Sequence, residues 1–344
     1  MTYAWLALAN LGCSRTELPD WSTETGVPAP RGEEGAEDDA CAANSGVSTL
    51  FSGPGTPNAV AAYAGHVYFA DWAFGGSLSV MARDGSGLRV LATDQPAVTD
   101  IAVDEGGVVW ATTGLTTPGG RLLSLDTLGR TRVLLEKLNQ PGGLAMDPQR
   151  VCLAEGSNSG SGNIAAVRIG RVLCVERSSG RVETLAEGFT VVTDVALDET
   201  HVYFTDPFGG VVARAPLRGG AVETLATGIG AAHVAVRAGQ VYVGAGSGLY
   251  VLPNSGGTPA LLAELDLQVF SFAAAADALY LTSRSRSGAG EGKLYRVRET
   301  GVVDVLASNQ LALKGLALDS THVYWAGGDA PPAYVRAQCK NAVP

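Results

Sequence analysis

Four side chains that could do chemistry occupy one position of an internal repeat, eight residues before the first apolar residue of a recurring motif: Asp100, Asp194, His233 and Ser271. Asn58 and Lys314 flank the same position in two further copies. Where such copies converge, an oxygen-rich ring can hold Ca²⁺, and Asp with His can hold a transition metal that activates water. The alternative is that these polar side chains have no function and are simply tolerated in a solvent-filled channel mouth.

The repeat is clearest at residues 200–206, which read THVYFTD. Close copies occupy 65–71 (GHVYFAD) and 321–327 (THVYWAG), and weaker or degenerate copies occupy 106–112, 149–155, 239–245 and 277–283. The first apolar residues of successive copies are 38 to 51 residues apart, which gives seven units.

A period of roughly 40 residues, built from short β-branched and aromatic runs between Gly and Asp turns, is typical of four-stranded propeller blades. We therefore predict an all-β protein, a seven-bladed β-propeller, with six blades as the alternative. In the fourth unit the strands are expected, from the inside outward, at 194–198, 202–206, 211–216 and 221–226.

The ring is expected to close through an N-terminal strand. Residues 47–53 (VSTLFSG) match the outer strands 182–188 (VETLAEG) and 222–228 (VETLATG), yet precede the first unit. The seventh unit has strands at 314–319, 322–326 and 333–337, after which the chain ends. Strand 47–52 should complete the last blade, so that no sheet edge is left open to aggregation.

Cysteine positions support this closure. Aligning the seventh unit with the fourth places Cys339 level with Leu217, and Cys41 falls beside it in the same hairpin turn. A disulfide between them would lock the ring and imply an oxidising compartment. Cys152 and Cys174 lie on the second and third strands of the third unit, and strand register decides between a second disulfide and two buried thiols.

The N-terminal residues 1–13, an apolar run ending at Gly12-Cys13, resemble a bacterial lipoprotein signal segment, which implies Cys13 as the lipid attachment site. The alternative is a buried or unstructured N-terminus. Residues 14–46 include the acidic run 33–39 and few apolar residues, so we expect a disordered tether. Residues 47–339 would then form a single propeller domain, and 340–344 a tail.

Charge and motifs limit the function. A net charge of −10 argues against nucleic-acid binding, which needs a basic face. The sequence has no nucleophile elbow and no phosphate loop. Polar insertions at 156–170 and 284–291 fall on the face where second and third strands connect; they are either functional loops or tolerated insertions. We expect a monomer that contacts membrane only through a lipid anchor.

The segments 203–206 (YFTD) and 324–327 (YWAG) resemble the YWTD repeat of receptor propellers. Residues 47–339 as a whole resemble bacterial extracytoplasmic TolB-like and NHL-like propellers, including uncharacterised lipoproteins. The resemblance implies that the repeat acids Asp71 and Asp206, with Glu155 at the same position, brace neighbouring strands or blades.

The resemblance also implies a place in the bacterial cell envelope, facing the periplasm or the outside, as a module that binds an envelope or surface protein or a glycan. A second hypothesis is a metal-dependent hydrolase similar to gluconolactonase-type propellers, with Asp100, Asp194 and His233 as ligands. A third is a purely structural scaffold. No motif requires a cofactor, and Ca²⁺ is the candidate ion.

Overall fold

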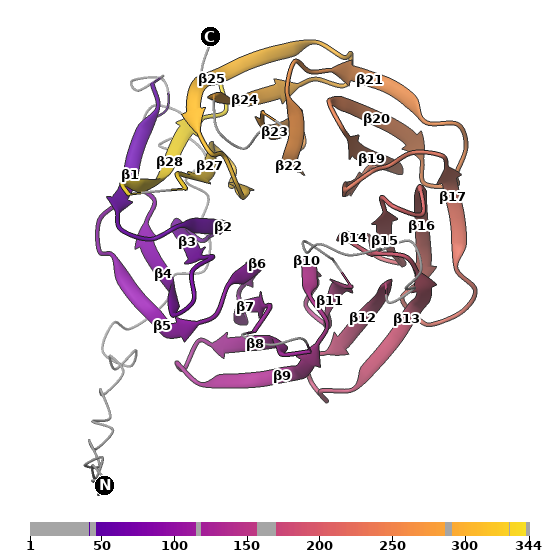
Figure 1. The fold of residues 1–344 in the computed structure, drawn as a ribbon, viewed down its shortest axis with the longest axis horizontal. Helices are drawn as coiled ribbons and strands as arrows, with labels where there is room; N and C mark the ends of the chain where they lie inside the picture. Colours follow the sequence, from indigo (N-terminus) through magenta and orange to yellow (C-terminus); the bar gives the residue numbers. More distant parts are fainter. Residues whose placement is uncertain are drawn as a thin grey trace, which may run out of the picture.

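The chain folds as a ring of seven blades around a central channel (Figure 1). A computed structural model describes residues 41, 46–114, 118–156, 170–285, 291–329 and 331–341. Each blade is a four-stranded antiparallel sheet, so the predicted seven-bladed propeller is confirmed and the six-bladed alternative is wrong.

Each blade runs from an inner strand at the channel to an outer strand at the rim. The inner strands are β2 (Pro57–Tyr63), β6 (Val98–Asp104), β10 (Pro141–Met146), β14 (Asp194–Leu197), β18 (His233–Arg237), β22 (Gln268–Ala274) and β26 (Leu316–Leu318). The second strands are β3 (His66–Asp71), β7 (Gly107–Thr112), β11 (Arg150–Glu155), β15 (His201–Asp206), β19 (Gln240–Ala245), β23 (Leu279–Arg284) and β27 (His322–Gly327).

The third strands are β4 (Gly76–Ala82), β8 (Gly120–Asp126), β12 (Gly170–Glu176), β16 (Val211–Pro216), β20 (Gly248–Pro253), β24 (Glu291–Val297) and β28 (Ala333–Cys339). The outer strands are β5 (Arg89–Gln95), β9 (Thr131–Leu138), β13 (Val182–Phe189), β17 (Glu223–Thr227), β21 (Ala260–Glu264) and β25 (Val303–Leu311), with β1 (Ser48–Gly53) serving the seventh blade.

The hydrophobic core lies between blades rather than inside any one of them. One cluster packs Cys152 and Val172 of the third blade against Val202 and Phe204 of the fourth. Second and third strands such as β15 and β16 are covered on both faces and are therefore mostly apolar, whereas an outer strand such as β17 buries only two of its residues. The inner strands contact one another in order around the ring, and β26 contacts β2.

The predicted closure is confirmed. Strand β1 pairs antiparallel with β28, and residues of the first and seventh blades share one core cluster. Cys41 and Cys339 form a disulfide. The alignment with Leu217 was off by one residue, because Cys339 faces His322 just as Pro216 faces His201. The longer turn between β27 and β28 shifts the register.

The third blade has a second disulfide, between Cys152 and Cys174. The two residues are direct partners in the β11–β12 pairing. Of the two possibilities left by the sequence, a disulfide and two buried thiols, the structure therefore has the disulfide. Two disulfides favour an oxidising, extracytoplasmic location.

Several predictions fall outside the residues described above. These are the signal segment with Cys13, most of the acidic tether, and most of the insertions at 156–170 and 284–291. In the part of the chain that is described, no helix is long and apolar enough to cross a membrane.

Candidate functional site

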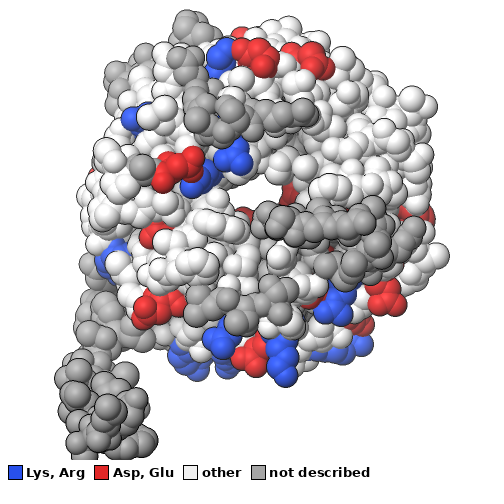
Figure 2. All heavy atoms as spheres, viewed as in Figure 1, with Lys and Arg blue, Asp and Glu red and all other residues white. Residues whose placement is uncertain are grey.

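A cavity of about 780 Å³ lies where the inner strands begin, at the mouth of the channel. All six residues singled out from the sequence line it: Asn58, Asp100, Asp194, His233, Ser271 and Lys314. Figure 2 shows the opening at the centre of the ring. The cavity also includes residues at the ends of second strands, so its mouth is on the face where second and third strands connect.

The two carboxylates tie neighbouring blades together. Asp100 accepts hydrogen bonds from the backbone N–H of Ile101 (2.8 Å) and from that of Leu144 (2.8 Å) in the next blade. Asp194 is bonded in the same way to Val195 (2.9 Å) and Val234 (3.0 Å). Both therefore have a structural role, and each keeps acceptor capacity, since a carboxylate offers about four lone-pair sites.

The pKa of the Asp100 carboxyl is raised to about 7. Burial is the main cause, the N–H groups of Leu144 and Ile101 oppose the rise, and the charge of Asp194 adds to it. A carboxyl of this kind exchanges its proton near neutral pH.

Other polar side chains hold the ring of inner strands in place. The amide of Asn58 donates to the carbonyls of Val98 and Thr99, each at 3.3 Å, in the next blade. The hydroxyl of Thr193 donates to the Ala232 carbonyl (2.8 Å) and that of Thr282 to the Lys314 carbonyl (3.0 Å), again across blade boundaries. Much of the polarity at the mouth thus comes from blade-to-blade hydrogen bonds.

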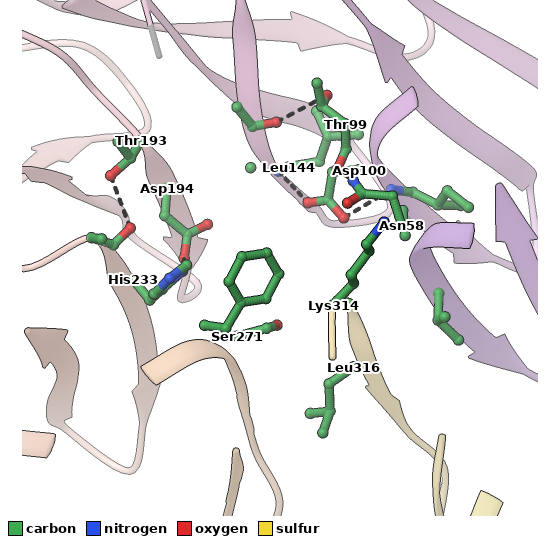
Figure 3. Close-up of a pocket in the computed structure, with 18 of the residues that line it drawn as sticks. Asn58, Thr99, Asp100, Leu144, Thr193, Asp194, His233, Ser271, Lys314 and Leu316 are labelled. Atoms are coloured by element: carbon green, nitrogen blue, oxygen red, sulfur yellow. Dashed lines mark hydrogen bonds and ion pairs between the residues drawn. The ribbon is translucent and has the colours of Figure 1, made fainter. Parts of the chain in front are cut away.

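The three proposed metal ligands divide into two groups. The Nδ1 of His233 lies 3.8 Å from Asp194 Oδ2. Asp100 lies on the other side of the cavity, with Asn58 and Lys314 (Figure 3). Among the residues that the structure describes, these three do not form a cluster whose ligand atoms all lie within 4.8 Å of one another. As arranged here, they do not coordinate one ion together.

Two cations line the same cavity. Lys314 is almost fully buried and its ammonium lies 3.0 Å from Asp329 Oδ1. Arg284 stacks its guanidinium over the ring of Phe270, 3.8 Å from the centroid. Burial lowers the pKa of Arg284, and Asp329 opposes the shift.

Sequence reasoning missed the aromatic part of the site. Trp72, Phe270 and Phe272 line the cavity with Arg284 and Asp329. Trp72, Arg284 and Asp329 are the last residues of second strands or follow them closely, so the ends of the repeat motif could have revealed them. Phe270 and Phe272 flank Ser271 on β22, and only the strand register tells which side chains face the channel.

The repeat acids Asp71, Glu155 and Asp206 brace the connections between blades, as predicted. Asp206 accepts the backbone N–H groups of Thr190 (2.7 Å), Val191 (3.3 Å) and Gly209 (2.8 Å). Asp71 accepts that of Thr56 (3.1 Å), and Glu155 that of Asn139 (2.6 Å). Each carboxylate holds the segment that leads into its own blade against the end of the second strand.

No protein family and no curated protein matches the chain. Solved structures do. A streptogramin B lyase superposes with a TM-score of 0.65 at 11% identity, over 86% of this chain and 97% of the lyase. A puromycin hydrolase gives 0.60 at 16%, over 82% of this chain and 51% of the hydrolase. PorZ, a surface component of the type-IX secretion system of Porphyromonas gingivalis, gives 0.55 at 16%, over 81% of this chain and 36% of PorZ. At these identities the likeness concerns the fold alone.

Proposed function

We propose that this protein is an extracytoplasmic binding propeller that takes a glycan into the mouth of its central channel. The observation that carries the proposal is the composition of the 780 Å³ cavity, which combines aromatic rings with planar and charged hydrogen-bonding groups. Ligand sites of this size, roughly 300–1,000 Å³, bind through such an apolar lining with a few polar groups.

The polar and apolar groups complement a sugar ring. Sugars present an apolar C–H face, which stacks on rings such as Trp72 and Phe270, and hydroxyl groups, which exchange hydrogen bonds with carboxylates and with Lys or Arg. Asp194, Lys314 and Arg284 supply those partners around one cavity. The stacking of Arg284 on Phe270 holds the guanidinium in one orientation, so that it binds with little loss of rotamer entropy.

The face around the mouth also has exposed aromatic residues. Trp72, Phe74 and Phe208 are 40%, 76% and 59% exposed. All three follow a second strand, β3 or β15, so they lie on the loop face that surrounds the cavity. When one end of a polymeric glycan is bound in the cavity, the rest of its chain can stack on these rings.

Glycan-array screening followed by calorimetry tests this function. A ligand should bind the wild type, and Trp72→Ala and Lys314→Met should each weaken binding about tenfold or more, because each removes a contact of roughly 1.4 kcal/mol. Leu128→Ala is the control, since Leu128 is an exposed apolar residue in the turn between β8 and β9, on the face opposite the cavity. Binding of a purified protein partner without any glycan, or binding unchanged by Trp72→Ala, would contradict the proposal.

A hydrolase or lyase is the second candidate, favoured by one observation. Asp100 has a pKa of about 7, which suits a general acid or base, and it faces the same cavity. Two proteins with this fold are named as a lyase and a hydrolase. Lactone turnover that is abolished by Asp100→Asn, in a variant that still folds, would support the enzyme over the binding module.

Lipid anchoring at Cys13 and a place in the bacterial envelope complete the proposal. Mass spectrometry of the exported protein tests the anchor, which adds lipid at Cys13 and removes residues 1–12. An intact Met1 with an unmodified Cys13 would leave the propeller as an unanchored extracytoplasmic protein.

A further inference from the structure

The seam that closes the ring brings together three potential metal ligands. His322 Nε2 lies 3.5 Å from Cys339 Sγ and 3.7 Å from Cys41 Sγ, and all three ligand atoms lie within 4.8 Å of one another. Within the described part of the chain, this is the one group of three or more His, Cys, Asp or Glu side chains that meets that spacing. In the structure the two sulfurs are bonded to each other.

The imidazole is held in the orientation that a ligand needs. Thr321 Oγ1 lies 3.3 Å from Asp319 Oδ1 and 2.7 Å from His322 Nδ1. An ionised carboxylate only accepts hydrogen bonds, so the hydroxyl donates to Asp319 and accepts from Nδ1–H. In the tautomer that matches these contacts the proton is on Nδ1, and Nε2, the nitrogen nearer the sulfurs, is the one that can bind a metal. Such an outer partner is usual for metal-binding histidines.

The fourth blade has the same Asp–Thr–His hydrogen-bond chain, but no cysteines beside it. Thr200 Oγ1 lies 2.8 Å from His201 Nδ1 and 2.9 Å from Asp198 Oδ1. The strand partners differ, however: His201 pairs with Pro216, whereas His322 pairs with Cys339. The oriented imidazole belongs to the repeat, and only the closing seam adds two cysteines to it. In the sequence, His201 and His322 occupy the same position of the repeat, and only their partners across the strand distinguish them.

The separations of nitrogen and sulfur already fit a tetrahedral ion. With Zn–S of about 2.3 Å and Zn–N of about 2.0–2.1 Å, a tetrahedron places sulfur and nitrogen about 3.6 Å apart. The observed values of 3.5 and 3.7 Å match that edge. The Cα atoms of the two cysteines, 5.6 Å apart, need move little when the sulfurs separate to make room for the ion.

We propose that the reduced form of this protein binds one Zn²⁺ at Cys41, Cys339 and His322, so that a metal closes the ring in place of the disulfide. A dithiol reductant supplies two electrons and two protons, is itself oxidised to a disulfide, and leaves two thiols. Zn²⁺ then displaces both thiol protons and bonds to two thiolates and the imidazole. The fourth position takes a water molecule, because three protein ligands leave a tetrahedral site open.

The choice of ion follows from the donors. Two thiolates and one imidazole select a borderline-soft ion such as Zn²⁺ over Ca²⁺ or Mg²⁺, which require oxygen ligands. The site lies at the seam and not in the channel, so its occupancy is independent of the proposed glycan site.

Cobalt titration of the full chain tests the proposal, in a Cys13→Ser background that removes the fifth thiol. The protein is reduced with a phosphine under anaerobic conditions and titrated with Co²⁺. We expect one equivalent to bind, with intense sulfur-to-cobalt charge-transfer bands, and Zn²⁺ to displace it. Cys41→Ser should abolish the bands, whereas Cys152→Ser, which leaves the seam intact, should not.

The histidine is tested by a matched pair of variants. Thr321→Val should weaken binding about 10–100-fold through loss of the outer partner, and His322→Ala by more than that. Thr200→Val and His201→Ala should change nothing. Bands that survive Cys41→Ser, or equal affinities of His322→Ala and His201→Ala, would overturn the proposal.

Reduction could also unfold the chain before metal is added. In that event Zn²⁺ should restore the β-sheet circular dichroism signal of the reduced wild type but not of reduced Cys41→Ser. A reduced wild type that neither binds cobalt nor refolds with zinc would overturn the proposal as well.

Discussion

The carboxylate of Asp194 accepts a 3.0 Å hydrogen bond from the backbone N–H of Val234, which belongs to the next blade. Its other oxygen accepts the N–H of Val195. A residue at the proposed binding site therefore also joins two inner strands. Loss of ligand binding in a variant of Asp194 has to be separated from loss of the fold.

Asp194→Ala should lower the free energy of unfolding by about 2–6 kcal/mol, because two backbone N–H groups lose their acceptor and each costs about 1–3 kcal/mol. Asp194→Asn should cost less, since the amide oxygen still accepts one of them. Urea denaturation measures both. Equal stability of the wild type and the Ala variant would show that water replaces the carboxylate without cost.

Asp100 should make stability fall as pH rises. Its folded pKa of about 7 exceeds the ordinary 3.8, so between these values the folded state holds a proton that the unfolded state has lost. Stability from this group is complete below about pH 4, declines through the window, and is lost above about pH 7. The wild type should therefore lose stability relative to Asp100→Asn as the pH is raised.

Denaturation of the wild type and of Asp100→Asn at pH 4 to 8 measures this difference in stability. Asp198 and Asp319 make stability rise with pH, but they do so equally in both proteins, so their contribution cancels in the difference. The pKa values of those two carboxyls are lowered in spite of burial, because hydrogen bonds from Tyr203 and Tyr324 and from turn N–H groups stabilise the charge. A difference that stays constant with pH would mean that Asp100 is ionised throughout.

The repeat motif was sufficient to predict the blades because each copy carries its own strands and turns. The prediction for the fourth blade was correct to the residue for β16 and within two residues elsewhere. The same periodicity located Asp100, Asp194 and His233 at one cavity. It could not show that the two carboxylates bind backbone N–H groups across blade boundaries, because those partners lie about 40 residues away in the chain.

Side-chain contacts between strands could not be predicted from the sequence. Whether Cys152 meets Cys174 depends on the register of β11 and β12, which the insertion between them conceals. The stacking of Arg284 on Phe270 likewise joins two strands of one blade whose side-chain orientation no local pattern fixes. Local sequence predicts which elements form, and tertiary register decides which side chains meet.

Asp206→Ala should be more damaging than Asp194→Ala. It leaves three backbone N–H groups without their acceptor, and those of Thr190 and Val191 are in the segment that enters the fourth blade. At 2% exposure, Asp206 gives water little access to replace it. We expect a loss of at least about 3 kcal/mol by urea denaturation. Asp84→Ala is the control, because that carboxylate is in an exposed turn and should have a much smaller effect.

Deletion of residues 41–52 should prevent cooperative folding. It removes nearly all of β1, exposes the edge of β28, and uncovers Phe69 of the first blade, whose ring lies 4.9 Å from that of the deleted Phe51. Circular dichroism during heating should show a broad transition, and the protein should aggregate through its open edge. Deletion of residues 14–40 is the control and should leave the melting temperature unchanged. An unchanged melting temperature without β1 would refute the closure argument.

Cys41→Ser and Cys339→Ser should each lower the free energy of unfolding by about 2–5 kcal/mol under oxidising conditions, since either change opens the same 298-residue loop. The double variant should cost no more than the larger single effect, because the two residues act as one unit. Free-thiol counting should find one new thiol in each single variant. Additive costs in the double variant would mean that the cysteines stabilise the seam separately, by packing rather than by their bond.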